Sequence, residues 1–234
     1  MSSPFPTLSV CIPTWHQNGL GPKFIEDALA SLVQQTLSNF QVVISDHSDN
    51  DTILEVVDKV RKDIDIKYIR NTNNRGNGPA NTNFAIENAD GDIVKILFHD
   101  DFMSDSRALE LILNEFSSKD VFWVVTGCNH TDAIKSRYWN EMIPYWSMEI
   151  FDGVNTISSP SVMAFRKDTN LRFDEDLVMM MDIDMYYNLY LNHGLPKILS
   201  EILVTNRVHK DALSWQFDWK TEDEKLYLKE KYKI

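Results

Sequence analysis

Two adjacent aspartates, Asp100 and Asp101, come directly after the apolar run at residues 93–98. Successive side chains of a strand point to opposite faces, so one carboxylate could bind a divalent metal while the other accepts a hydrogen bond from a ligand hydroxyl. A pair of aspartates is also common in turns and at helix caps, which is the alternative interpretation. The position at the end of a buried strand favours ligand binding.

The segment at residues 71–79 is unsuited to any regular element, because it holds four asparagines and two glycines. Such residues adopt left-handed conformations and form local hydrogen bonds. The segment enters a helix at Pro79, a favoured first-turn residue, so free backbone N–H groups and the side chain of Arg75 could face an anion. The alternative is an ordinary surface loop.

The elements that position these residues can be predicted from hydrophobic spacing. Short apolar runs alternate with helical patterns, which favours βαβ units around a largely parallel sheet. We expect strands over residues 8–12, 40–45, 66–69, 92–98, 121–126 and 161–165, and helices from Pro22 and over residues 53–60, 79–88, 106–116 and 183–192.

Polar segments follow each of the first four predicted strands, at residues 13–19, 46–51, 71–78 and 99–101. In open parallel sheets, ligands bind outside the carboxyl ends of the strands. We therefore expect these four segments to share one edge of the sheet and to form a binding site there.

The charge balance excludes one class of partner. The chain has 35 acidic and 23 basic residues, a net charge of −12, and a field of that sign repels polyanions. Nucleic acid is therefore not expected as a partner. Phosphate can still be a ligand, because carboxylates recruit divalent cations that contact phosphate oxygens.

The chain shows no sign of export or of membrane insertion. Its start lacks the cationic and apolar regions of a signal peptide, and no run approaches the ~18 apolar residues of a membrane span. Cys11 and Cys128 lie in apolar stretches and are expected to be buried free thiols, so we predict a cytoplasmic protein. The tail, residues 220–234, mixes lysines with apolar residues, which permits a helix in peripheral contact with a membrane; a solvated terminal helix is the alternative.

Four motifs in order and spacing resemble the nucleotide-binding half of glycosyltransferase family 2 enzymes. They are LSVCIPTW, FQVVISDHSDND, NTNNRGNGPANTNFAIENADGDIV and ILFHDDFM. The resemblance covers residues 7–103 and continues more loosely to about residue 215. It implies a GT-A fold in a single domain over residues 1–234. Residues 1–103 would bind the nucleotide-sugar, and residues 104–234 would form the acceptor half and a C-terminal helix.

The resemblance also implies roles for individual residues. Pro13 and Thr14 would line the nucleoside pocket, Asp46 would bind the base, and Arg75 would lie near the base or the phosphates. Asp100 would contact the ribose, and Asp101 would bind Mn²⁺ or Mg²⁺. Phe98 and His99 stand where the family often has another acid. The resemblance further implies that Arg207 closes over the diphosphate and that His209 is a metal ligand; an ordinary loop histidine is the alternative.

The family's catalytic base is an aspartate at the start of a helix in the acceptor half, and Met181, Asp182, Ile183 and Asp184 resemble that place. Asp182 and Asp184 are two positions apart in the chain, so their side chains point in directions roughly 200° apart around a helix. They therefore cannot share one site. Asp184 lies on a side with Asn188 that we expect to be solvated, whereas Asp182 lies with Tyr186 on the inward side. We therefore predict Asp182 as the base, with a simple helix cap as the alternative.

These roles imply an inverting glycosyltransferase that moves a sugar from a nucleotide diphosphate-sugar to a hydroxyl of a glycan acceptor. A lipid-linked acceptor in bacterial surface polysaccharide synthesis, such as O-antigen or capsule, would fit the family. A metal-dependent nucleotidyltransferase and a non-catalytic glycan-binding module are the alternatives. Five tryptophans could stack on sugars or fill the core: Trp15, Trp139, Trp146, Trp215 and Trp219.

Overall fold

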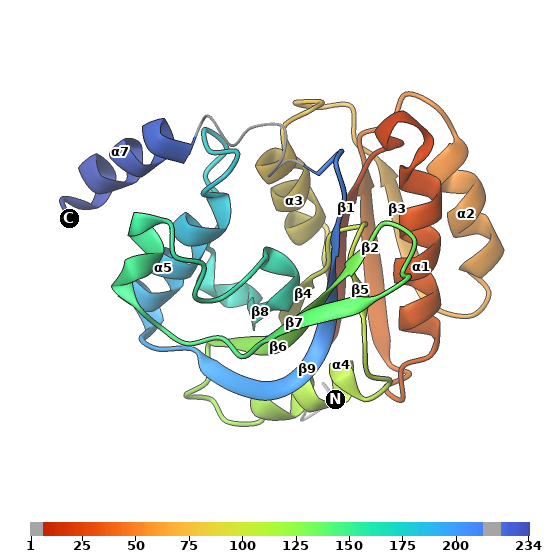
Figure 1. Cartoon of the computed structure of the whole chain (residues 1–234). Helices are drawn as coiled ribbons and strands as arrows, with labels where there is room; N and C mark the ends of the chain where they lie inside the picture. The colour runs from red at the N-terminus through yellow and green to blue at the C-terminus, as the bar shows by residue number, and fades with distance from the viewer. Residues whose placement is uncertain (1–6, 213–220) are drawn as a thin grey trace.

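The computed structural model describes residues 7–212 and 221–234, and Figure 1 shows helices arranged around one central sheet. The strands are β1 (Leu8–Thr14), β2 (Phe40–Asp46), β3 (Asp65–Arg70), β4 (Ile93–Ile96), β5 (Phe102–Met103), β6 (Trp123–Asp132), β7 (Tyr138–Met142), β8 (Met163–Arg166) and β9 (Lys197–Val208). The helices are α1 (Gly21–Val33), α2 (Thr52–Val60), α3 (Gly78–Glu87), α4 (Ala108–Glu115), α5 (Met181–His193) and α7 (Thr221–Tyr232). Trp215 and Trp219 lie outside the described residues.

The strands form one nine-stranded sheet in the order β3-β2-β1-β4-β8-β6-β9-β5, with β7 paired to β6. The pairings of β1 with β2, β1 with β4 and β2 with β3 are parallel, as the alternation of strands and helices predicted. The second half departs from this pattern, because β8 runs antiparallel to both β4 and β6. The α/β class is confirmed, with a parallel first half and a mixed second half.

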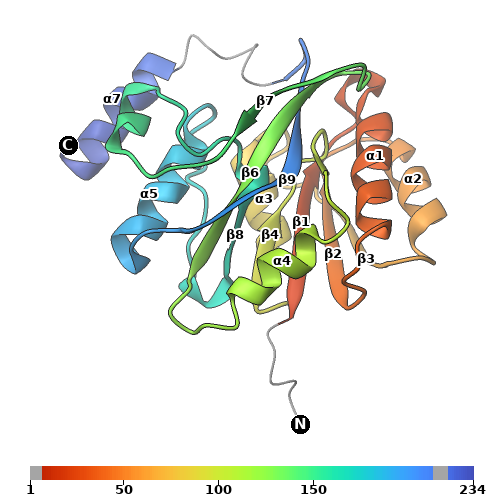
Figure 2. The ribbon, with the colours of Figure 1, turned by 60° about the horizontal axis from the view of Figure 1, so that its bottom comes forward.

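The order of the strands determines on which face of the sheet the helices α1, α2 and α3 lie. From β1 to β2 to β3 the chain moves in one direction across the sheet, and from β3 it returns past β1 to β4. Because such crossovers are right-handed, α1 and α2 lie on one face and α3 lies on the opposite face. Figure 2 shows α1 and α2 together at one side of the molecule, with α3 behind β1 and β4.

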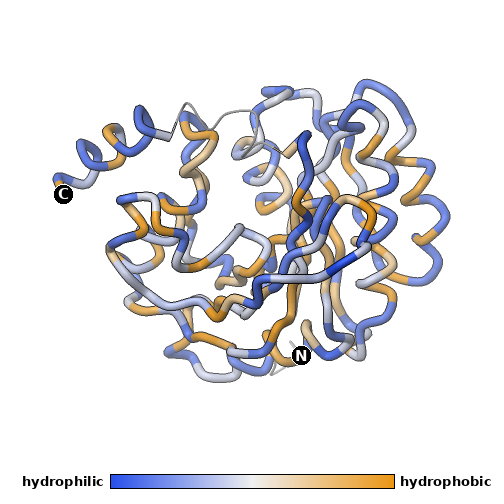
Figure 3. Tube along the Cα trace, viewed as in Figure 1, coloured by the Kyte–Doolittle hydropathy of each residue, from blue (hydrophilic) through white to orange (hydrophobic). Residues whose placement is uncertain are grey.

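The core follows from apolar residues on both faces of the central strands. Val10, Val42, Ile44 and Val94 are fully buried, and Figure 3 shows that hydrophobic residues concentrate in the strands and in the helix faces turned towards them. Cys11 and Cys128 are buried and free, as the sequence predicted. No helix within residues 7–212 or 221–234 is both long and apolar enough to cross a bilayer.

The C-terminal helix α7 lies beside α5, away from the sheet (Figure 1). Its buried residues are Glu224 and Leu228, whereas Leu226, Tyr227 and Ile234 are exposed. The helix that the tail composition permitted is therefore present and contacts the rest of the protein. Its contact with a membrane stays a prediction.

Candidate functional site

The carboxyl ends of the first strands meet at one edge of the sheet, as expected. Thr14 of β1 pairs in register with Asp46 of β2, and Asp46 pairs with Arg70 of β3. β4 joins the same edge, because Leu97 N–H donates to the carbonyl of Cys11, and the chain then continues to Asp100. Parallel pairing thus brings together residues that lie far apart in the sequence.

Asp46 is completely buried and has partners for both carboxylate oxygens. Its Oδ1 accepts from the N–H and hydroxyl of Ser48 at 2.8 and 2.5 Å, and its Oδ2 accepts from the Tyr68 hydroxyl at 2.6 Å. Arg70 Nε lies 3.5 Å from the same Oδ2. Burial and the hydrogen bond to Asp46 raise the pKa of Tyr68, so the phenol stays a donor. Sequence reasoning missed these partners, although their order on β3 places Tyr68 and Arg70 on one face.

The other predicted nucleoside and phosphate residues lie around this cluster. Thr14 is buried, and its hydroxyl has no hydrogen-bond partner within residues 7–212 and 221–234, while Pro13 beside it is partly exposed. Arg75 is exposed and donates to the carbonyl of Ser48 at 3.2 Å, so it stands over the end of β2. Asn77 caps α3 by accepting from the N–H of Ala80 at 2.8 Å, which occupies one of the N–H groups expected to be free.

The two adjacent aspartates point to different partners. Asp100 Oδ2 lies 3.1 Å from His209 Nε2, with 20% of the Asp100 side chain exposed. Asp101 is 5% exposed; its Oδ1 accepts from the backbone N–H of Arg207 at 2.9 Å, and its Oδ2 accepts from the Ser159 hydroxyl at 3.4 Å. The more accessible carboxylate is therefore Asp100.

The electrostatic environment separates the pair further. Burial acts to raise the pKa of Asp100, but the hydrogen bond from His209 and the charges of His99 and His209 outweigh it, so the pKa lies below its usual value. Burial and the neighbouring Asp100 charge raise the pKa of Asp101 to about 7. Asp100 is thus the member of the pair that stays ionised more readily, whereas Asp101 can hold a proton near neutral pH.

The donor set fits a cation that is shared with a ligand. A carboxylate and an imidazole, from Asp100 and His209, suit Mn²⁺ and also Mg²⁺ when further oxygens come from phosphate and water. Within the described residues no group of three or more His, Cys, Asp or Glu side chains is placed to hold a metal. His209 Nδ1 is buried and has no hydrogen-bond partner among the described residues. Asp100 and His209 could therefore supply two of the ligands to such a cation.

Arg207 is placed differently from the prediction that it closes over a diphosphate. Its side chain is 0% exposed; its guanidinium donates to the carbonyls of Asp100 and Ala133 and to Asp27, each at 2.8 Å. The guanidinium also lies over the ring of Phe24, 4.6 Å from its centroid. These contacts hold the segment that carries His209 against the acidic pair. Direct contact of Arg207 with a donor would require it to leave these partners.

Asp182 lies in the first turn of α5 and is partly buried. Its Oδ1 accepts from the N–H of Ile183 at 2.9 Å. Burial raises its pKa to about 7, against the smaller effect of that hydrogen bond. A carboxylate with this pKa is suited to taking up a proton near neutral pH.

The expectation that Asp184 faces solvent is wrong. Asp184 is 1% exposed and accepts from Lys231 Nζ at 2.7 Å and from the Tyr232 hydroxyl at 2.6 Å, while Asn188 donates to it at 3.1 Å. The helix wheel placed Asp184 on the polar side of α5, but α7 covers that side. Asp184 is therefore fully engaged in holding α7, which leaves Asp182 as the freer of the two carboxylates.

A short chain of contacts connects α5 to the acidic pair. Tyr186, one turn after Asp182, donates its hydroxyl to the carbonyl of Ser158 at 3.1 Å. The next residue, Ser159, donates to Asp101. The two acidic positions predicted from the sequence are thus brought to the same region. Ser158 and Ser159, which sequence reasoning missed, precede Pro160 in the polar segment NTISSPS, and nothing in that segment singled them out.

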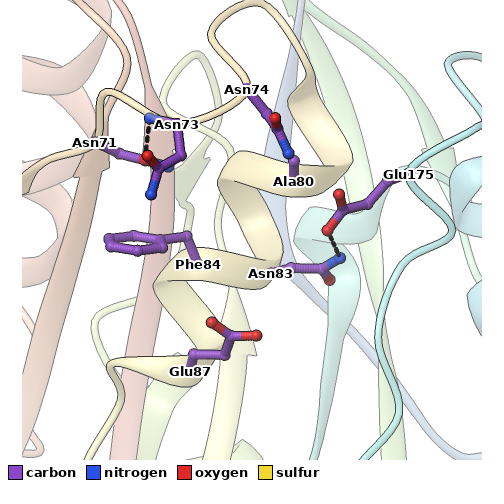
Figure 4. Close-up of a pocket in the computed structure, with 8 residues that line it drawn as sticks. All are labelled: Asn71, Asn73, Asn74, Ala80, Asn83, Phe84, Glu87 and Glu175. Atoms are coloured by element: carbon purple, nitrogen blue, oxygen red, sulfur yellow. Dashed lines mark hydrogen bonds between the residues drawn. The ribbon is translucent and has the colours of Figure 1, made fainter.

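A pocket of about 170 Å³ lies beside α3, and neither the acidic pair nor Asp182 lines it (Figure 4). It is lined by Asn71, Asn73, Asn74, Ala80, Asn83, Phe84, Glu87 and Glu175. Its polar walls are already bonded to each other in part, since Asn83 donates to Glu175 and Asn71 accepts from the N–H of Asn73. The pocket shares the loop before α3 with Arg75 but includes none of the predicted site residues.

The α/β fold, with an acidic pair at the carboxyl ends of its strands, places the protein in the class of GT-A folds. Its similarity to known proteins gives the family. The model of glycosyl transferase family 2 matches residues 9–188. The chain therefore belongs to glycosyl transferase family 2, and its sheet and helices have the GT-A fold of its structural neighbours.

Two curated relatives are similar in sequence to this chain. The poly(ribitol-phosphate) beta-N-acetylglucosaminyltransferase TarS of Staphylococcus aureus is 25% identical over 199 residues, which are 82% of this chain and 34% of TarS. The GalNAc(5)-diNAcBac-PP-undecaprenol beta-1,3-glucosyltransferase of Campylobacter jejuni is 33% identical over 97 residues, 41% of this chain and 30% of that enzyme. The chain thus spans about a third of the length of these relatives.

Two solved structures share the fold. A crystal structure of S. aureus TarS 1–349 in complex with UDP-GlcNAc aligns with a TM-score of 0.69 at 21% identity, covering 87% of this chain and 59% of that one. The mannosyltransferase PcManGT from Pyrobaculum calidifontis, in complex with GDP-Man and Mn²⁺, aligns with a TM-score of 0.68 at 17% identity, covering 97% and 64%.

Proposed function

We propose that this protein is an inverting glycosyltransferase that transfers a sugar from a nucleotide diphosphate-sugar to a hydroxyl of a glycan acceptor. One arrangement carries the proposal: Asp100 and His209 lie 3.1 Å apart at the strand edge, and the partly buried Asp182 lies at the start of α5, which Tyr186 joins to Ser158 beside that edge. The pKa of Asp100 lies below its usual value and that of Asp182 is raised to about 7. Pairs of acids whose environments push their pKa values apart are typical of sites with divided roles.

The strand edge is proposed to bind the donor. Pro13 and Thr14 would line the nucleoside, with the unpartnered Thr14 hydroxyl available to it. Asp46 would recognise the base, either directly or through the hydroxyl and guanidinium groups that it holds. Arg75, exposed above β2, would contact the phosphates. The structural neighbours with UDP-GlcNAc and GDP-Man support a nucleotide-sugar as the donor.

Mn²⁺ or Mg²⁺ is proposed as the cofactor, held by Asp100 and His209 together with the diphosphate. When bound, such a cation balances the charge of the leaving diphosphate as a Lewis acid. The geometry favours Asp100 for this role, although the family resemblance assigns it to Asp101 and the ribose to Asp100. Asp101 lies next to the cation site, and its bonds to Arg207 N–H and Ser159 would support that site from behind. Arg207 would act with it by fixing the His209 segment.

Asp182 is proposed as the general base. An acceptor hydroxyl is a weak nucleophile until a positioned group takes its proton, and a carboxylate with a pKa near 7 can do so at neutral pH. With the base on the side opposite the leaving diphosphate, the acceptor attacks in a single displacement. The anomeric configuration inverts, and no covalent intermediate forms.

The acceptor is proposed to be a lipid-linked or polymeric glycan of a bacterial surface polysaccharide. The curated relatives support this class, since one name includes a poly(ribitol-phosphate) polymer and the other an undecaprenol-linked glycan. We further propose a cytoplasmic location with α7 in peripheral contact with the membrane, where the exposed Leu226 of the helix and Ile234 just after it would meet the lipid. Nucleic acid is not proposed as a partner.

A transfer assay tests the proposal. The protein is incubated with UDP- and GDP-sugars and Mn²⁺, and the released nucleotide and the anomeric configuration of the product are measured. We expect nucleoside diphosphate and an inverted product, with activity lost in EDTA and in Asp100→Asn. Asp58→Asn, an exposed change on α2, is the matched control and should behave as wild type. Release of pyrophosphate would indicate a nucleotidyltransferase, and donor binding without turnover would indicate a non-catalytic module.

A further inference from the structure

The C-terminal helix α7 contributes a side chain to the start of α5. Glu224 is 7% exposed, and its carboxylate accepts three backbone N–H groups: Val178 at 2.9 Å, Met179 at 2.8 Å and Met180 at 2.8 Å. The first N–H groups of a helix have no partner within the helix, and its N-terminus carries a partial positive charge. Met180 is the N-cap residue of α5, and Val178 and Met179 precede it, so Glu224 holds the segment that leads into the helix from another element of the chain.

α7 is also attached to α5 one turn further along. Lys231 and Tyr232 bind Asp184 of α5 at 2.7 and 2.6 Å, and Leu228, between Glu224 and these residues, is fully buried. The rings of Tyr232 and Tyr187 lie 4.7 Å apart in an edge-on contact. Two polar attachments with an apolar contact between them fix how α7 lies on α5.

Asp182 lies between the two attachments. It is two residues after Met180, which Glu224 holds, and two residues before Asp184, which Lys231 and Tyr232 hold. No side-chain cap holds the start of α5 from its own N-cap position. The direction of the Asp182 side chain therefore depends on contacts that α7 makes.

We propose that Glu224 is a positioning residue for the reaction: it fixes the segment that enters α5 and so directs the Asp182 carboxylate towards the acceptor. This inference rests on the proposed function, in which Asp182 is the base. In the part of the chain that the structure describes, Glu224 and Tyr186 are the titratable groups that face Asp182, the first from α7 and the second from α5 itself. The charge of Glu224 adds to the burial that raises the pKa of Asp182.

Glu224→Gln tests the inference, because it keeps the size and one acceptor oxygen but removes the charge. We expect kcat to fall by ~10 to 10²-fold, the loss that a small misplacement of a catalytic group produces, with the donor dissociation constant unchanged. The midpoint of the kcat–pH profile should also move to lower pH, which a purely structural cap would not cause. Glu224→Asp, which keeps the charge, should keep the midpoint. Glu222→Gln, on the same helix with 81% of its side chain exposed, is the control and should match wild type.

A second measurement does not depend on transfer. The pKa of the Asp182 carboxyl, followed by ¹³C NMR without substrate and assigned with Asp182→Asn, should be lower in Glu224→Gln than in wild type. A wild-type kcat and an unshifted Asp182 pKa in folded Glu224→Gln would overturn the inference and leave the proposed function intact. An active Asp182→Asn would instead refute the base assignment, and with it the role given to Glu224.

Discussion

Asp182 and Asp184 are two residues apart on one helix, yet their surroundings give them different chemistry. Asp184 is buried against Lys231 and Tyr232, so its charge is balanced and both oxygens are occupied. Asp182 is partly buried, with a hydrogen bond from Ile183 N–H and a pKa raised to about 7 by burial. A balanced carboxylate holds structure, whereas a carboxylate with a raised pKa can exchange a proton.

The first prediction concerns transfer. Asp182→Asn should lower kcat by ~10² to 10⁴-fold, the usual contribution of a general base, because the amide cannot accept the acceptor's proton. Donor affinity, measured by calorimetry, should stay within a factor of about two. In wild type, kcat should rise with pH through about 7, because only the ionised carboxylate takes up a proton. A nearly normal turnover of Asp182→Asn would place the base elsewhere.

The second prediction concerns stability at the same residue. The unfolded chain loses the Asp182 proton near pH 4, whereas the folded protein keeps it until about pH 7. Between these values the folded state binds more protons, so this group lowers the unfolding free energy by about 1.4 kcal/mol per pH unit. Asp182→Asn should therefore gain stability relative to wild type as pH rises from 5 to 7, with no further gain above pH 8. Urea unfolding at each pH measures this, and a pH-independent difference would contradict it.

Part of the candidate site could be predicted at the scale of residues. Thr14, Asp46 and the acidic pair were expected at one edge because parallel strands end together; the register of β1 with β2 confirms this for Thr14 and Asp46, and the parallel pairing of β1 with β4 brings the start of the acidic segment to the same edge. The partners of Asp46 could not be predicted, because the hydrogen bonds from Ser48 and Tyr68 depend on side-chain directions across two strands. Asp184 was misplaced because a helix wheel describes one helix, and its partner Lys231 lies 47 residues away.

At the scale of elements, the turn that leads from β1 into α1 leaves no room for a side chain at Gly21, the first residue of α1. A Cβ on Gly21 would lie 2.1 Å from the carbonyl oxygen of Trp15 and 2.9 Å from the carbonyl carbon of His16. Both are backbone atoms, so the whole turn would have to move. This turn continues from Pro13 and Thr14, and it therefore affects the proposed nucleoside pocket.

The third prediction follows from that contact. Gly21→Ala should destabilise the protein by about 1–3 kcal/mol, as overpacking does, and weaken nucleotide binding by moving the turn. Gly19→Ala is the control: nothing lies within 4 Å of its Cβ, but φ is +92°, so it should cost about 1–2 kcal/mol through backbone conformation alone. Thermal unfolding measures the loss of stability in each variant, and calorimetry measures the affinity of each variant for the nucleotide. Equal nucleotide affinity of Gly21→Ala and wild type would show that the turn does not shape the pocket.

The fourth prediction concerns the attachment of α7. Asp184→Asn should lower the unfolding free energy by about 1.5–3 kcal/mol, because it weakens charge-assisted hydrogen bonds to Lys231 and Tyr232. Limited proteolysis should then remove α7 faster than in wild type. Lys229→Met, which removes an exposed ion pair with Asp152, is the control and should change little. A stable but inactive Asp184→Asn would make Asp184 the base in place of Asp182.

The elements were predictable in proportion to their length and apolar spacing. β1, β2 and α1 follow strong patterns, and their bounds differ from the prediction by one or two residues. β5, with two residues, gives no periodicity, and β7 is an exposed strand whose alternation is masked by aromatic residues. The antiparallel pairing of β8 was also beyond reach, because it joins β4 to a segment far along the chain.

At the scale of the whole molecule, the acidic charge and the proposed ligand oppose each other. The net charge is −12, and the edge that would receive a diphosphate carries Asp46, Asp100 and Asp101. Arg70 is already bound to Asp46 and Asp51, and Arg207 is buried, which leaves exposed Arg75 as the arginine near this edge with access to a phosphate. In the proposed function, a divalent cation between the acids and the phosphates would resolve this conflict.

The fifth prediction is therefore that nucleoside diphosphates stabilise the protein only together with Mn²⁺ or Mg²⁺. A ligand at 100 times its dissociation constant adds ~2.7 kcal/mol, which for a chain of this length corresponds to a rise in Tm of about 5–10 °C. UDP and GDP with Mn²⁺ should give this rise, while either nucleotide in EDTA or Mn²⁺ alone should give little. Asp100→Asn should abolish the rise in Tm that nucleotide and Mn²⁺ give together, whereas Asp58→Asn should keep that rise. An equal rise in EDTA would mean that the protein itself neutralises the diphosphate, and the proposed role of the metal, of Asp100 and of His209 would then be wrong.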